Sequence, residues 1–139
     1  MQKILERSFS LYEQSFLDDK NSTLSMEEGI KALVEGHFRF CQDNKELTRI
    51  LFWDTDTMDE ELRQWACQQR LQKEQRLQIF LEEGMSRGEI RTLDAQVLTV
   101  VIGGVLGSIW MPVVIDGWMV DAAAASQQIT DMIMNGIKK

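Results

Sequence analysis

His37 and Cys41 have the spacing of two metal ligands on one helix face, because residues four positions apart lie above one another on a helix. No third soft ligand lies near them, and the 139-residue chain has 1 histidine in all. We therefore expect His37 to be a satisfied core residue. The sequence predicts neither a metal site nor a cofactor.

Catalysis is not indicated either, because we find no nucleophile beside a base and no paired acid and base. The carboxylates are scattered over positions that we expect to be exposed, and the serines fall at helix caps or small-residue contacts. Cys67 has no histidine near it in any predicted geometry, and the 2 cysteines fit neither a disulfide framework nor a zinc finger. We expect a protein that is not an enzyme, in a reducing, cytoplasmic setting.

The aromatic residues favour binding of a small, largely apolar molecule. They fall, with a few polar residues, on the inner stripes of the first four predicted helices, and ligand pockets have this mostly apolar lining. Core packing is the alternative for each aromatic residue taken singly. The predicted ligand-binding residues are Phe9, Tyr12, Leu33, His37, Trp53, Trp65 and Gln69, together with Trp110 of the fifth predicted helix, which could close the far wall.

The inner stripe of the fourth predicted helix changes from apolar to polar and back. If it faces the core throughout, Gln69 and Lys73 or Arg76 must meet a partner, because an unpaired buried cation is very costly. A bound anionic or hydrogen-bonding ligand would be such a partner. The alternative is that residues 68–76, QQRLQKEQR, are exposed to water, as charged runs usually are.

The composition of the chain limits both the kind of protein and the fold that can hold these residues in place. The chain has 15 Lys and Arg against 22 Asp and Glu, a net charge of -7, which excludes a free-standing nucleic-acid binder. With 1 Pro and 9 Gly it has too few turn residues for a sandwich or barrel. Its 44% hydrophobic residues suit a single all-α domain over residues 1–139.

Apolar periodicity and capping residues predict roughly six helices. Ser25–Glu28 and Thr57–Glu60 have the form of capping boxes, and Gly88 fits the left-handed residue that closes a helix. Pro112 should bend or end the fifth helix early. The expected helices run from Lys3 to Leu17, from about Met26 to Asp43, after Asn44, from the capping box Thr57–Glu60 to about Ser86, from Ala95 after the cap Asp94 toward Ile115, and from Ala122 after Asp121.

No charge occurs between Asp94 and Asp116, a stretch long enough to span a bilayer. Both flanking residues are acidic, so the Lys and Arg asymmetry that orients membrane helices is missing, and we expect no membrane partner. A helix that is apolar all round must be covered, and a domain this small needs a second copy to cover it. We predict a homodimer through the last two helices, with interface residues Val97, Val101, Gly104, Val105, Ser108, Ile129, Met132 and Ile133.

Several short motifs follow one another in the second half of the chain. Glu83–Arg91 is a helix end with a Glu-Gly…Gly-Glu-Ile-Arg pattern, Asp94–Ala95 is an acidic cap, and Gly103, Gly104 and Gly107 are small residues of the predicted interface helix. Met134–Ile137 is similar to a closing Leu-x-Gly. In order and spacing these motifs resemble the second half of the TetR family of transcriptional regulators. The resemblance implies an all-α C-terminal domain that binds an effector and dimerises through a four-helix bundle.

The chain departs from that family in one respect. A basic helix-turn-helix domain of about fifty residues precedes this region in the family and reads the major groove. Nothing in these residues corresponds to it, so the resemblance implies an effector-binding domain that meets DNA only through a domain missing here. The alternatives are a ligand-free dimeric helical interaction module and a membrane-associated helical protein.

Overall fold

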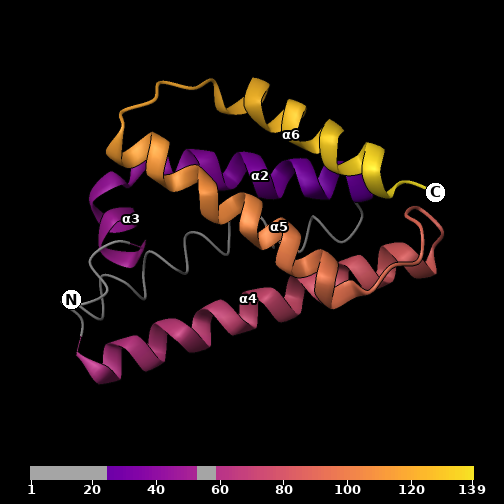
Figure 1. The fold of residues 1–139 in the computed structure, drawn as a ribbon, viewed down its shortest axis with the longest axis horizontal. Coiled ribbons are helices and arrows are strands. Elements are labelled where there is room, and N and C mark those ends of the chain that lie inside the picture. Colours follow the sequence, from indigo (N-terminus) through magenta and orange to yellow (C-terminus); the bar gives the residue numbers. More distant parts are fainter. Residues whose placement is uncertain (1–24, 53–58) are drawn as a thin grey trace.

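The structure, a computed structural model, describes residues 25–52 and 59–139 (Figure 1). Within these ranges it is all-helical, with no strand beyond an isolated bridge between Ile90 and Lys138. The all-α prediction is confirmed, whereas the helix predicted from Lys3 to Leu17 lies outside the described residues. The elements are α2 (Met26–Asp43), α3 (Lys45–Phe52), α4 (Glu60–Ser86), α5 (Ala95–Trp110), the π-helical turn η3 (Met111–Ile115) and α6 (Ala122–Ile137).

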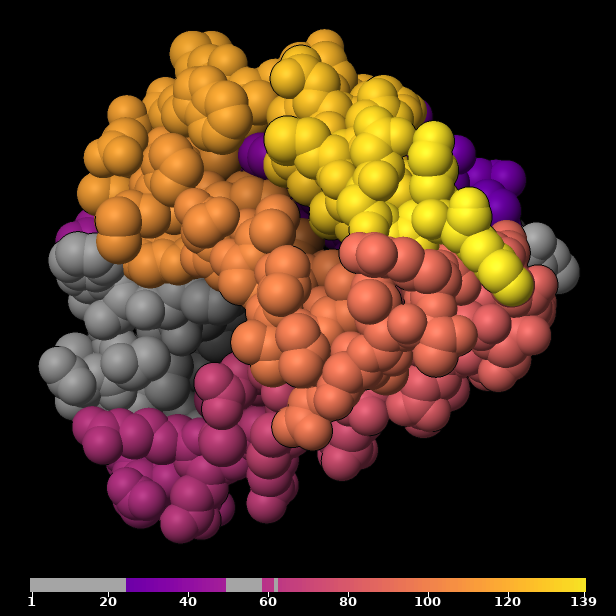
Figure 2. Space-filling view, turned by 45° about the vertical axis from the view of Figure 1, so that its right-hand side comes forward, coloured from indigo at the N-terminus to yellow at the C-terminus, as the bar shows by residue number. Residues whose placement is uncertain are grey.

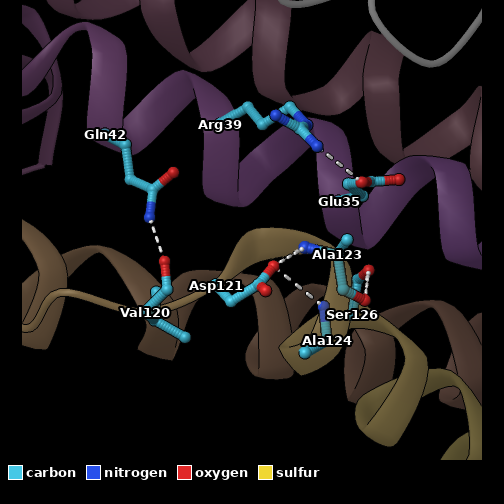
Figure 3. Close-up of polar contacts among 8 residues, drawn as sticks. All are labelled: Glu35, Arg39, Gln42, Val120, Asp121, Ala123, Ala124 and Ser126. Carbon is cyan, nitrogen blue, oxygen red and sulfur yellow. Dashed lines mark hydrogen bonds and ion pairs between the residues drawn. The ribbon is translucent and has the colours of Figure 1, made fainter.

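Helix α2 lies at the centre of the described part, with α6 running antiparallel along it (Figure 1). Helix α5 crosses toward α2 after packing on the C-terminal part of α4. Two hydrogen bonds hold the ends of α6. Gln42 of α2 donates through Nε2 to the carbonyl of Val120 at 2.7 Å (Figure 3), and the amide of Arg91 donates to the carbonyl of Ile137 at 2.8 Å.

The helix starts follow the capping residues. The side chain of Asp94 accepts from the amides of Gln96 and Val97 at 2.9 and 3.2 Å. Asp121 does the same for α6, accepting from the amides of Ala123 and Ala124 (Figure 3). These carboxylates satisfy amides that have no partner within the helix and lie at its positive end. Both predicted aspartate caps are confirmed.

The predicted capping box at the start of α2 forms only in part. Ser25 Oγ accepts from the amide of Glu28 at 3.2 Å, as expected, but the Glu28 carboxylate accepts from the Ser25 hydroxyl instead of a backbone amide. The amide of Met26 donates to Oε1 of Glu89, which lies in the loop after α4. Arg87 holds the other oxygen of this carboxylate at 2.7 Å. The start of α2 is thereby tied to the end of α4.

Two glycines let α2 approach α4 closely. A Cβ at Gly29 would overlap the ring of Phe80, and a Cβ at Gly84 would overlap the side chain of Met26. Each helix therefore inserts a large side chain where the other has none. Gly88, at φ +75°, closes α4 in the left-handed region as predicted.

Pro112 ends the regular part of α5, as predicted. The last α-helical residue is Trp110, and the chain continues as the π-helical turn η3, in which the Asp116 amide donates to the carbonyl of Met111. Proline has no amide to donate within the turn. Val113 of η3 is fully buried, and η3 packs against α2 and α3. The π-helical geometry itself was not predicted.

Candidate functional site

His37 is a buried polar side chain of α2, with 3% of its surface exposed. It forms a hydrogen bond with the backbone of Leu106 in α5. Burial, helped by the positive charge of Lys73, lowers the pKa of His37 to about 4, and the hydrogen bond opposes this only in part. The imidazole is therefore neutral at pH 7 and lies where α2, α4 and α5 come together.

The polar section of α4 was predicted either to face the core or to be exposed to water, and the structure shows some of its residues in each position. Trp65, Gln69 and Lys73 are half-buried and Leu77 is buried, so this stripe faces the rest of the domain. Arg70 is exposed and forms an ion pair with Glu74 at 4.0 Å. The charged run therefore divides, with Lys73 turned inward while most of its neighbours face water.

The structure describes five of the eight predicted ligand-binding residues. Leu33 and His37 are buried one turn apart on α2, and Trp110 is buried one turn beyond Leu106 on α5. Trp65 and Gln69 approach from α4 as half-buried residues. Phe9, Tyr12 and Trp53 lie outside the described residues. Ligand binding by this set stays a prediction.

Cys41 is buried beside His37 on α2 but has the properties of a structural thiol. Burial raises its pKa to about 12, against a smaller opposing effect of a hydrogen bond with Thr48. A thiol of this kind is protonated and unreactive at pH 7. Within residues 25–52 and 59–139, no three His, Cys, Asp or Glu side chains come together as metal ligands would.

The pKa of His37 makes stability depend on pH. The unfolded chain binds a proton near pH 6.5, but the folded chain binds it only near pH 4, so acidification between these values favours unfolding. The difference amounts to about 3 kcal/mol. We expect urea unfolding of the wild type to lose about this much more stability from pH 7 to pH 4 than unfolding of His37→Gln. Equal losses in both proteins would contradict it.

The side of α5 that points away from the core is an exposed apolar face. Val97, Val100 and Val101 are 60%, 67% and 55% exposed, and Met111 of η3 is 41% exposed. Gly103, Gly104 and Gly107 lie on the same side, and a Cβ built on any of them would meet nothing within 4 Å. In the described chain, this face is uncharged and open to close approach of another backbone.

Helix α6 extends this face. Met132 is 69% exposed, and Ile129 and Ile133 are half-buried beside it. Figure 2 shows α5 and α6 next to each other on one side of the molecule. Of the predicted interface residues on α5, Val97, Val101, Gly104 and Ser108 are exposed, while Val105 is half-buried. Their place in a dimer stays a prediction.

Sequence reasoning missed part of this face and one aromatic contact. Val100 and Met111 are exposed beside the predicted positions, and no sequence signal separates them from their neighbours, because the whole stretch is apolar. Trp118, in the loop after η3, packs its ring edge-to-face on Phe38 at 6.2 Å between centroids. Its proximity to α2 depends on how η3 turns the chain.

The segment Ala95–Ile115 is long and apolar enough to cross a membrane. Length and composition alone are weak evidence for a single helix, because the core helix of a water-soluble domain has the same properties. Here Leu98, Ile102 and Leu106 are buried against the rest of the domain. The packing is that of a core helix with one uncovered side.

The all-helical architecture and the sequence together define the class of protein. Residues 23–137 match the family described as the tetracyclin repressor-like C-terminal domain. The chain belongs to this family. It is thus part of a transcriptional regulator, as the TetR resemblance implied, and not an enzyme, as its residues indicated.

Solved structures of TetR-family regulators share its fold. A TetR/AcrR regulator from Thermobifida fusca superposes with a TM-score of 0.75 at 21% identity, covering 99% of this chain and 73% of that one. The ketosteroid regulator KstR2 of Mycobacterium tuberculosis gives 0.79 at 17%, with 99% and 71% covered. The fatty acid degradation regulator FadR of Bacillus halodurans gives 0.75 at 19%, with 99% and 72% covered. A comparison with curated proteins finds no match.

Proposed function

We propose that this chain is the effector-binding and dimerisation domain of a cytoplasmic, TetR-like transcriptional regulator. The observation that carries the proposal is the uncharged, glycine-containing face of α5, which is exposed in the single chain and continues onto α6. A contiguous exposed apolar surface marks an interaction site in water-soluble proteins.

A second copy is the partner that suits this face. With α5 and α6 of both chains packed as a four-helix bundle, the glycines allow the helices to approach closely while the valines and Met132 exclude water. A two-fold interface places the same residues against each other in both copies, and an uncharged face meets itself without repulsion. The contact would involve Val97, Val101, Gly104, Val105, Ser108, Ile129, Met132 and Ile133.

The effector would bind between α4 and the pair α2 and α5. Leu33, Trp65 and Trp110 would form its apolar and aromatic walls, and Gln69 and His37 would be the polar groups. This composition suits a small, largely apolar molecule held in orientation by a few polar contacts. The names of KstR2 and FadR refer to ketosteroids and fatty acid degradation, and an apolar effector here would agree with them.

Control of DNA binding would pass through the first predicted helix, Lys3 to Leu17, to a helix-turn-helix domain outside these 139 residues. An effector that favours one packing of this helix changes the spacing of the two recognition helices in the dimer. DNA half-sites require a separation of about 34–36 Å, so a small change weakens binding. The effector would thereby relieve repression.

Native mass spectrometry of the purified chain tests the proposal, because it reports the mass of the assembly and of any small molecule retained with it. We expect the mass of two chains at micromolar concentration, without detergent. A folded single chain under these conditions would contradict the dimer. A dimer that takes up no apolar ligand would point to a ligand-free interaction module.

A further inference from the structure

The exposed apolar face of α5 ends in opposite charges. Arg91, in the loop before α5, and Asp116, directly after η3, are both exposed. The amide of Arg91 donates to the carbonyl of Ile137, and Ile90 forms a bridge with Lys138, so the exposed Lys138 lies at the same end as Arg91. One end of the face is therefore basic and the other is acidic.

Two further carboxylates lie at these ends, but they already have partners. Asp94 and Asp121 each accept hydrogen bonds from two backbone amides at the start of a helix. Within residues 25–52 and 59–139, the structure shows no ion pair for the guanidinium of Arg91 or the carboxylate of Asp116. The two cannot pair within one chain, because α5 lies between them and its 16 residues span about 24 Å.

A two-fold axis can bring two copies of α5 together in parallel or in antiparallel orientation. Parallel packing places Arg91 beside the partner's Arg91, and Asp116 beside the partner's Asp116. Like charges then meet at both ends of the contact and oppose association. Antiparallel packing instead places the basic end of each copy beside the acidic end of the other. The charges of the face therefore favour the antiparallel orientation.

The glycines of α5 lie where two antiparallel helices would cross. Gly103 is twelve residues after Arg91, and Gly104 is twelve residues before Asp116. A Cβ built on either glycine would meet nothing within 4 Å. With the two-fold axis at these glycines, each Arg91 lies opposite the partner's Asp116. Helices in four-helix bundles cross at about 20°, so the ends of two such helices stay within reach of an arginine side chain.

We propose that two copies of this domain pack α5 against α5 in antiparallel orientation, with an ion pair between Arg91 of each copy and the partner's Asp116. This inference rests on the proposed dimer and adds its orientation and its charged contacts. A single exposed ion pair contributes little affinity, but symmetry provides two, and like charges oppose the parallel arrangement. The apolar centre of the face supplies the affinity, and its charged ends determine the orientation.

Reversing either charge tests the contact. Arg91→Glu brings two acidic groups together at each end of the dimer, and Asp116→Arg brings two basic groups together. We expect each variant to raise the dissociation constant of the dimer about tenfold at low salt, as measured by sedimentation velocity. The variant that carries both substitutions should return to within about threefold of the wild type. Arg70→Glu is the matched control, because Arg70 is exposed on α4 and not on this face.

Mixing the two single variants distinguishes a contact between chains from an effect within one chain. A dimer of one Arg91→Glu chain and one Asp116→Arg chain has a pair of opposite charges at both ends, whereas neither homodimer has one. Native mass spectrometry of the equimolar mixture should therefore show the heterodimer in clear excess over its random share. A mixture of the wild type with Arg70→Glu should give the random share.

The result also separates this contact from the proposed dimer. If the heterodimer forms only in its random share, or if both single variants dimerise like the wild type, the antiparallel ion pair is wrong and the dimer stands. If the wild type is itself a single chain at micromolar concentration, the dimer is wrong and this contact with it.

Discussion

Replacing Val101 by glutamate should convert the dimer into a folded single chain. The side chain is 55% exposed in the isolated chain and lies beside Gly104, so the monomer loses little when it is replaced. In the proposed dimer the two-fold axis would bring two new carboxylates into one apolar contact. Burying an uncompensated charge costs about 3–5 kcal/mol, so dissociation should be favoured by more than about 100-fold.

Light scattering coupled to size-exclusion chromatography at micromolar concentration measures this effect. Ile79→Glu is the matched control, because Ile79 is 56% exposed but lies on α4, away from the proposed interface. The control should remain a dimer, and far-ultraviolet circular dichroism should show both variants to be helical. A Val101→Glu protein that retains the mass of two chains would place the interface elsewhere.

The helix boundaries could be predicted because their causes are local. Asp94 and Asp121 accept hydrogen bonds from amides two and three residues further on, and Gly88 takes a backbone conformation that other residues avoid. Pro112 stops the α-helical pattern whatever surrounds it. Such interactions are visible in a short stretch of sequence, so the described helices begin and end close to their predicted positions.

Contacts between distant segments could not be predicted in this way. Glu89 accepts from the amide of Met26, 63 positions away, and so replaces part of the expected capping box. Phe80 fits against Gly29 only because α2 and α4 meet at their ends. Neither contact produces a periodic or local pattern in the sequence, because each depends on how the helices pack together.

In the candidate site, too, local features could be predicted from the sequence, whereas features that depend on helix packing could not. Periodicity placed the inner stripe of α4 but left Lys73 and Arg76 as equal candidates for the inward position. Burial distinguishes them, with Lys73 half-buried and Arg76 exposed. Likewise, the uncharged stretch predicted a covered helix, but which side of α5 stays open depends on where α2 and α4 pack. Val100 and Met111 therefore became visible as part of the exposed face only in the folded chain.

Truncating Trp65 to alanine should weaken binding of a neutral apolar ligand without affecting the dimer. Its half-buried side chain on the inner stripe of α4 is the largest that this helix offers to the proposed site. Loss of a tryptophan from a binding site costs about 2 kcal/mol or more, which corresponds to about 30-fold in affinity. Gln69→Ala should lower affinity less, by about fivefold, because it removes a single neutral hydrogen-bonding group.

Titration with the uncharged fluorescent dye N-phenyl-1-naphthylamine measures the affinity, and native mass spectrometry of the same samples measures the assembly. Trp118→Ala is the control for loss of a tryptophan, since Trp118 is 49% exposed and packs on Phe38 outside the proposed site. It should bind the dye as the wild type does. Should Trp65→Ala instead yield single chains with unchanged dye affinity, α4 would belong to the subunit contact, and the effector would have to bind elsewhere.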